Sequence, residues 1–252
     1  FEINVKRGWS AMARLYLELS KSIDRRVNMH DTPLRQFNEL SREIIHRIET
    51  TNSTPEKIID MDAAAVGGIV HNQKAGKNVL RLAQRLPHLY VEADVKPITR
   101  GILRIILQVY IDFQWDMSYH GLSEPFHIWM EDGENETIYH SEFFLARKKQ
   151  HDTKEAAIIE FTIPISQPVP AQYYVRVVSD RWVGCESCIA VSFQHLILPE
   201  RMPPHTPLLD LHPVPKSALG NPIYESLFPN FTHFNPIQSQ TFHMLFHTDQ
   251  NV

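Results

Sequence analysis

The sequence has little cysteine and no long hydrophobic run. Two cysteines stand among 252 residues, too few for a disulfide framework and typical of a reducing, intracellular compartment. No stretch approaches the roughly 20 apolar residues that a membrane helix requires. We therefore expect a protein that does not work with a membrane and that relies on packed cores rather than on disulfides.

Motifs of catalytic chemistry are also missing. The chain has no Gly-x-Ser-x-Gly elbow, no His-Glu-x-x-His motif, and neither the phosphate loop nor the Asp-Glu box of nucleotide hydrolysis. Cys185 and Cys188 have the spacing of a zinc knuckle, but a structural site needs a second pair of ligands. We therefore predict no catalytic residue, no metal site and no enzymatic activity completed within these residues.

The composition is that of a globular protein with more than one core. Of the 252 residues 43% are hydrophobic and 21% charged, and the net charge is −4, which allows two or three small domains. This charge argues against a mainly electrostatic nucleic-acid binder, although a local basic stripe is compatible with it. The chain opens on Phe1-Glu2-Ile3 as in the middle of a helix, so we expect a piece of a longer protein.

Residues 1–52 have the apolar spacing of helices. Large apolar side chains recur at intervals of three and four residues and predict one helix over residues 6–28: Trp9, Met12, Tyr16, Leu19 and Ile23. Pro33 ends this part of the chain, and Ser41 has a side chain that can cap a second helix.

Residues 53–87 predict three short helices. The Thr-Pro-Glu sequence at 54–56 combines a cap, a proline at the first helical position and an early acid, and Asp62 can cap a second piece. Gly67-Gly68 permits two backbones to approach closely. A third helix over residues 74–86 stops before a proline, which completes a helix-loop-helix unit.

One face of the third helix is basic. At 100° per residue four cations fall together, opposite the apolar face: Lys74, Lys77, Arg81 and Arg85. Such a stripe is commonly a solvated surface, but cations at one-turn spacing also follow the phosphates of a nucleic acid. We take these four residues, with Arg7 near the start of the chain, as the candidate nucleic-acid-binding residues.

Past Pro87 the apolar period changes from 3.6 to 2. Every second residue from Leu103 to Trp115 is apolar, which is a strong strand signal. Seven strand-like runs without intervening helices predict an antiparallel two-sheet sandwich of the immunoglobulin or fibronectin III kind. The runs cover residues 89–95, 103–115, 125–130, 137–145, 157–165, 173–179 and 188–198.

The last fifty residues change character again. An extended, proline-rich segment follows the sandwich, with prolines that cannot pair in a central strand: Pro203, Pro204, Pro207, Pro213 and Pro215. Short helical signals return over residues 221–247.

Several strings in this order resemble one family, the Sec sixty-three homology module of Ski-two-like helicases that carry two tandem cassettes. The resemblance covers essentially the whole chain and rests on residues 32–37, 97–100, 112–115 with His120-Gly121, 178–182, 194–200, 208–211 and 234–238. Gly67-Gly68 departs from the glycine–hydrophobic–glycine turn of the family's hairpin, so phosphate binding by that turn does not carry over.

The resemblance implies a multidomain α + β organisation. Residues 1–52 would end a helical bundle, 53–87 form the helix-loop-helix, and 88–200 the immunoglobulin-like sandwich. Residues 201–252 would be a linker and the start of the next helicase (RecA-like) domain. ATP and magnesium would be cofactors of the larger protein, with none in this chain.

Phe234 and Gln238 lie in a segment that resembles the family's adenine-reading motif. A glutamine amide can both donate to and accept from an adenine edge, which accounts for the residue type. No phosphate loop accompanies the segment in this sequence. It is therefore an orphan cofactor-binding motif here.

The sequence thus predicts a non-catalytic accessory module of an ATP-dependent nucleic-acid helicase. By resemblance it would guide single-stranded RNA or DNA, brace the adjoining cassettes of the same chain and meet other subunits of a multi-protein complex. The resemblance also implies ribosome quality control and DNA repair as roles of the larger protein, in nucleus and cytoplasm. The alternatives are a pure protein-interaction module, a secreted adhesive domain and a hydrolase.

Overall fold

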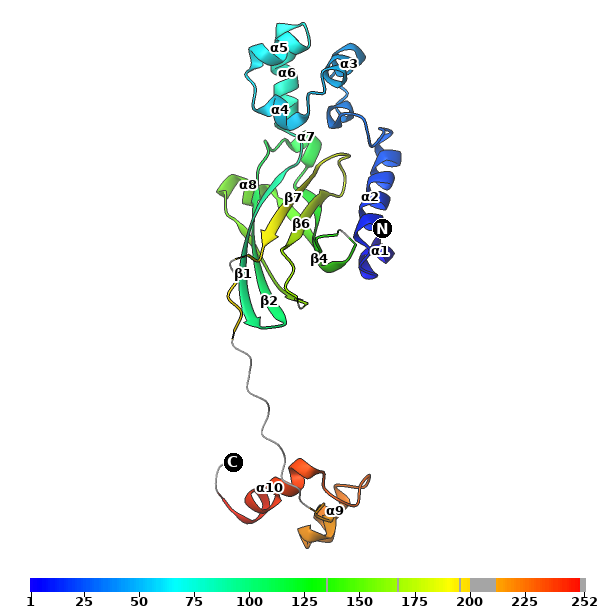
Figure 1. Cartoon of the computed structure of the whole chain (residues 1–252). Coiled ribbons are helices and arrows are strands. Elements are labelled where there is room, and N and C mark those ends of the chain that lie inside the picture. Colours follow the sequence, from blue (N-terminus) through cyan, green and yellow to red (C-terminus); the bar gives the residue numbers. More distant parts are fainter. Residues whose placement is uncertain (135, 167, 195, 200–211, 250–252) are drawn as a thin grey trace. The chain divides into compact units, whose positions relative to one another are not determined.

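A computed structural model describes residues 1–134, 136–166, 168–194, 196–199 and 212–249 (Figure 1). Contacts divide the chain into two compact units, Phe1–Glu200 and Arg201–Val252. The fold mixes α-helices with two antiparallel sheets, as the α + β class predicts. Residues 195 and 200 of the string at 194–200, the whole string at 208–211, and Pro203, Pro204 and Pro207 lie outside the described residues.

The first unit begins with helices whose starts are set by local capping. Their bounds are α1 Glu2–Lys6, α2 Ser10–Arg25, η1 Pro33–Gln36, α3 Arg42–Thr50, α4 Pro55–Ile59, α5 Ala63–Ile69 and α6 Gln73–Ala83. Ser41, Thr54 and Asp62 accept hydrogen bonds from backbone N–H groups three residues on, as their positions predict. The helices share a core of their own, from Leu34 to Leu86, to which the loop between two strands of the four-stranded sheet adds Trp182 and Cys185.

The prediction of one helix over residues 6–28 is wrong at its start. Gly8 has a φ of +77° and separates α1 from α2. Its carbonyl oxygen accepts a hydrogen bond from Ile138 N at 2.7 Å, so the backbone turns to pair with the sheet instead of continuing the helix.

The apolar stripe of α2 points away from the sheet that the helix covers. Its members are 42 to 71% exposed: Trp9, Met12, Tyr16, Leu19 and Ile23. The face buried against the sheet lies roughly a third of a turn away and consists of Ser10, Ala13, Leu17 and Lys21. The helix therefore meets its own sheet through a largely small and polar face.

Seven strands form two antiparallel sheets. Their bounds are β1 Leu89–Thr99, β2 Ile102–Ile111, β3 Ser123–Glu131, β4 Ile138–Arg147, β5 Ala157–Pro164, β6 Gln172–Ser179 and β7 Glu186–Ser192, with short helices α7 Met117–His120 and α8 Lys148–Thr153. One sheet has the order β1-β2-β5 and the other β4-β3-β6-β7. Alternate residues of β2, from Leu103 to Val109, are at most 1% exposed and enter a core that both sheets share.

The central strand β3 is buried on both faces. Phe126, Ile128 and Met130 enter the core between the sheets, whereas Trp129 packs on the other face with Leu17 of α2. The helix α2 thus covers the outer face of the four-stranded sheet (Figure 1), which explains why β3 lacks the alternation of a half-buried strand.

Two predicted strands end elsewhere. Alternation runs to Trp115, but β2 ends at Ile111, because Gln114 N donates to the Gln84 carbonyl at 2.7 Å and ties this segment to the helices. Phe113 and Trp115 stack on each other at 5.4 Å instead. The strand predicted over residues 188–198 begins two residues earlier and ends sooner, as β7 over Glu186–Ser192.

The second unit contains η2 Lys216–Leu219, α9 Pro222–Ser226 and α10 Pro236–His247, where helical signals occur in the sequence. In the part of the chain that the structure describes, no helix is both long and apolar enough to span a bilayer.

Candidate nucleic-acid interface

Lys74 and Lys77 are exposed on α6. Asn72 caps the start of the helix, and its side-chain oxygen accepts hydrogen bonds from the N–H groups of Lys74 and Ala75, both at 3.1 Å. Burial of Val79 and Leu82 on the opposite face turns the two lysines outward. Among the described residues neither lysine has an ion-pair partner, so both ammonium groups are available to an anion.

Arg81 and Arg85, by contrast, are paired with acids. Arg81 Nη2 lies 2.9 Å from Glu39 Oε2, and Arg85 Nη2 lies 2.9 Å from Asp116 Oδ2, with the Arg85 side chain only 19% exposed. The acids come from segments far away in sequence. The four-residue stripe is therefore divided into two free lysines and two arginines that hold α6 to its neighbours.

Arg7 is not brought together with this stripe. It follows α1, which lies along the four-stranded sheet, whereas α6 belongs to the helical layer at one end of the unit (Figure 1). The Arg7 guanidinium lies 4.9 Å from the ring centroid of Trp9.

The segment of the second unit that resembles an adenine-reading motif makes contacts within the unit. Phe234 is 7% exposed and packs against Phe242 with a centroid distance of 5.4 Å. Gln238 and Asn235 form a capping box in which Asn235 N donates to Gln238 Oε1 at 3.0 Å and Gln238 N donates to Asn235 Oδ1 at 2.8 Å. The Gln238 amide oxygen is thus engaged by the backbone of Asn235.

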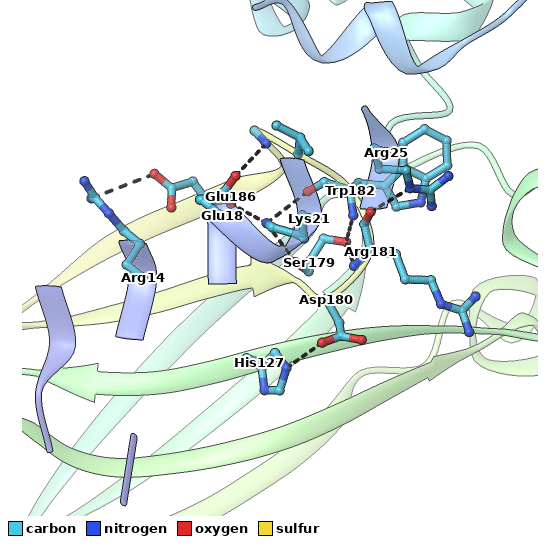
Figure 2. Close-up of polar contacts among 12 residues, drawn as sticks. Arg14, Glu18, Lys21, Arg25, His127, Ser179, Asp180, Arg181, Trp182 and Glu186 are labelled. Atoms are coloured by element: carbon cyan, nitrogen blue, oxygen red, sulfur yellow. Dashed lines mark hydrogen bonds and ion pairs between the residues drawn. The ribbon is translucent and has the colours of Figure 1, made fainter. Parts of the chain in front are cut away.

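Figure 2 shows a polar junction between α2 and the four-stranded sheet that sequence reasoning missed. Lys21 is 3% exposed, and its Nζ donates to the carbonyl oxygens of Ser179 at 3.0 Å and Trp182 at 3.1 Å and pairs with Glu18. Arg25 stacks 5.0 Å from the Trp182 ring. A lysine one turn from Leu17 on a small-residue face is the only sequence signal of this burial.

A second buried network centres on Glu131, which is 0% exposed. Arg176 donates to Glu131 Oε1 through Nε at 3.0 Å and Nη2 at 2.7 Å. Trp129 Nε1 donates to Oε2 at 2.8 Å, and the Ser10 hydroxyl of α2 also donates to it. A buried carboxylate with four donors is fully compensated.

Glu124 of β3 is also buried, but among the described residues it lacks hydrogen-bond donors of the kind that surround Glu131. It is 0% exposed, and within the described residues neither carboxyl oxygen has a hydrogen-bond partner. Burial raises the pKa of Glu124 to about 7, with Arg181 and Arg25 opposing the shift. The folded protein therefore retains this proton at pH values where the unfolded chain has released it.

The raised pKa of Glu124 leads us to expect that the protein loses stability as the pH rises. Because its folded-state pKa lies above the unfolded value, the free energy of unfolding falls as the pH rises through about 4.5 to about 7 and then levels off. We expect Glu124→Gln to abolish this contribution, so that the difference between wild type and variant changes by about 2 kcal/mol between pH 5 and pH 8. Urea denaturation at each pH measures it. A constant difference would contradict the assignment.

The two cysteines that have the spacing of a zinc knuckle both lie in the first unit. Cys185 is buried and Cys188 exposed, and both are free thiols. Burial raises the pKa of Cys185 far above its usual range. Within the described ranges no three histidine, cysteine or acidic residues are grouped closely enough to hold a metal ion.

Comparison with known proteins identifies the class of module. Residues 1–192 match the Sec63 Brl domain. The chain belongs to this family, which confirms the resemblance seen in the sequence.

Its relatives are much longer proteins. Over its full length the chain is 50% identical to activating signal cointegrator 1 complex subunit 3 of Rattus norvegicus. It is 45% identical to the DExH-box ATP-dependent RNA helicase DExH12 of Arabidopsis thaliana and 43% identical to the human U5 small nuclear ribonucleoprotein 200 kDa helicase. It spans 12% of the length of each. Of the region that the chain shares with these relatives, residues 1–192 are the Sec63 Brl domain.

Proposed function

We propose that this chain is a non-catalytic accessory module of an ATP-dependent nucleic-acid helicase. The observation that carries the proposal is full-length similarity to helicases in a sequence that has neither a phosphate loop nor an Asp-Glu box. ATP hydrolysis and its magnesium would belong to motor domains of the longer protein, and the module would contribute guidance, bracing and contacts with other subunits.

The guiding surface in this proposal is the outer face of α6. Lys74 and Lys77 are exposed and unpaired among the described residues, one turn apart on a helix that is fixed from behind by a packed core. Two ammonium groups at this spacing fit consecutive phosphates of a single strand. Arg81 and Arg85 would position the helix rather than contact the strand, because acids already neutralise them.

The bracing role rests on the exposed stripe of α2. Five large apolar side chains on one helix face form a contact surface for other helices. We propose that residues 1–52 complete a helical bundle of the longer protein through this stripe, that 53–87 form the helix-loop-helix, and that 88–200 form an immunoglobulin-like sandwich. Residues 201–252 would form a linker with a proline-rich start that leads into the next helicase domain.

Charge reversal tests the guiding role. We expect Lys74→Glu with Lys77→Glu to weaken binding of a labelled single-stranded oligonucleotide by about tenfold at low salt. The slope of log affinity against log salt should become shallower by roughly 1 to 2. Fluorescence anisotropy with RNA and with DNA measures both quantities.

The matched control is Arg100→Glu with Lys149→Glu, which changes the net charge equally at two exposed positions, one in the turn after β1 and one in α8. Its affinity should change far less. Equal weakening in both variants, or no binding by the wild type at low salt, would contradict the guiding role. Such a result would favour a pure protein-interaction module, which the neutralised arginines and the apolar stripe of α2 support.

A further inference from the structure

A pocket of about 500 Å³ lies at the seam between the helices and the sheets. Its walls come from α4, from the segment that joins α6 to β1, from the segment that follows β2 and from the start of β7. This volume is in the range of pockets that bind small ligands or a short stretch of peptide. It is separate from the outer face of α6, since neither Lys74 nor Lys77 lines it.

The floor of the pocket is apolar. Leu86, Phe113 and Phe126 line it, and each is at most 8% exposed because it belongs to one of the two cores. At the mouth Ile59 of α4 is 42% exposed. A single apolar side chain that entered here would exchange water for contacts with both cores.

The rim of the pocket is acidic. Glu56, Asp60, Asp112 and Glu186 line it, and among the residues that the structure describes no lysine or arginine does, although the chain has 25 such cations to 29 acids. Asp112 lies 3.4 Å from His88 at the same rim. Glu186 is shared with Arg14 and Arg176 at 3.9 and 4.0 Å, so Glu56 and Asp60 supply most of the uncompensated charge.

The walls of the pocket are held in place. Gly184 has a φ of +71°, and a Cβ there would approach Pro33 to 2.8 Å, so the loop before β7 is pressed against the helical layer. Gln84 and Leu86 line another wall, and the backbone between them is fixed by His120, 1% exposed, whose Nε2 forms a hydrogen bond with the Arg85 carbonyl oxygen at 2.9 Å. A preformed pocket loses little conformational entropy when a ligand binds.

We propose that this seam pocket binds a short segment of a partner protein in which an apolar side chain is flanked by lysine or arginine. The apolar floor takes the side chain and the acidic rim takes the cations. Phosphate groups would be repelled by the same rim, which disfavours nucleic acid as the occupant. The inference rests on the part of the proposed function that concerns contacts with other proteins. It does not depend on nucleic-acid binding by α6, so the oligonucleotide test and the peptide test can fail independently.

The test uses the 252-residue chain and a fluorescein-labelled peptide, Lys-Leu-Lys-Phe-Lys, with blocked ends. We expect saturable binding that Glu56→Gln, Asp60→Asn and Asp112→Asn together weaken by about tenfold, since each exposed charge contributes modestly. The control neutralises three exposed acids outside the pocket, Asp24→Asn, Glu43→Gln and Glu155→Gln, and should leave the affinity unchanged.

A further variant, Ile59→Ser, keeps all the acids and removes apolar surface at the exposed mouth. This variant should also lower the affinity for the peptide by several-fold. Circular dichroism checks that the variant keeps the fold. Equal loss in the control variant, no saturable binding by the wild type, or equal binding of a peptide with serine in place of leucine and phenylalanine would overturn the proposal. So would an oligonucleotide that displaces the peptide from the pocket, or self-association that the triple pocket variant abolishes.

Discussion

Glu131→Ala is expected to lower the free energy of unfolding by about 3 to 5 kcal/mol, because it leaves a buried guanidinium without its carboxylate. The Arg176 side chain is 10% exposed, and its two bonds to Glu131 are 2.7 and 3.0 Å long. The variant also deprives Trp129 and Ser10 of their acceptor. Urea denaturation, followed by tryptophan fluorescence, measures the loss.

Glu160→Ala is the matched control for this prediction. Glu160 pairs with Arg104 across β2 and β5, but both side chains are nearly half exposed, at 46 and 47%. Solvent screens this pair, so its loss should amount to about 0.2 to 1 kcal/mol. Similar losses for Glu131 and Glu160 would show that burial does not set the strength of the Glu131 network.

Gly76→Ala is expected to destabilise the helical layer by about 3 kcal/mol, which is the upper end of the usual cost of inserting an extra group into a packed core. A Cβ at this position would lie 2.6 Å from Gly67 Cα and 2.7 Å from the Ala63 carbonyl oxygen. These are backbone atoms of α5 that cannot swing aside, so α5 and α6 would have to separate. Thermal or urea unfolding of the two proteins gives the difference.

Gly68→Ala separates this clash from the general effect of alanine in a helix. Gly68 lies in α5 beside Gly67, but a Cβ there would meet nothing within 4 Å. Alanine should therefore stabilise the protein by up to about 1 kcal/mol through helix propensity. If Gly76→Ala also stabilised the protein, the close packing of α5 on α6 would be refuted.

The elements that the sequence predicts correctly are those set by nearby residues. The caps at Ser41 and Asp62 depend only on N–H groups three positions on. The alternation from Leu103 to Val109 predicts β2 because each inward side chain adds to one shared core. Gly67-Gly68 predicts a close backbone approach, and the structure shows one at Gly67, where Gly76 is the partner that the sequence does not reveal.

The features that escape prediction depend on residues far away in the chain. The break at Gly8 requires the N–H of Ile138, and the end of β2 requires the carbonyl of Gln84. In the candidate site a helical wheel places Arg81 and Arg85 beside the two lysines, but only the folded chain brings Glu39 and Asp116 to them. The pocket at the seam has no motif, since its lining comes from many segments that are separate in the sequence.

The way α2 is attached has a mechanical consequence. Apolar surfaces slide over one another at little cost, whereas the Lys21 ammonium and the Ser10 hydroxyl each have fixed acceptors on the sheet. A push or a twist applied to the outer stripe of α2 would have to break these directional bonds before the helix slipped. The helix and the sheet are therefore expected to move together as one rigid body when a force acts on either of them.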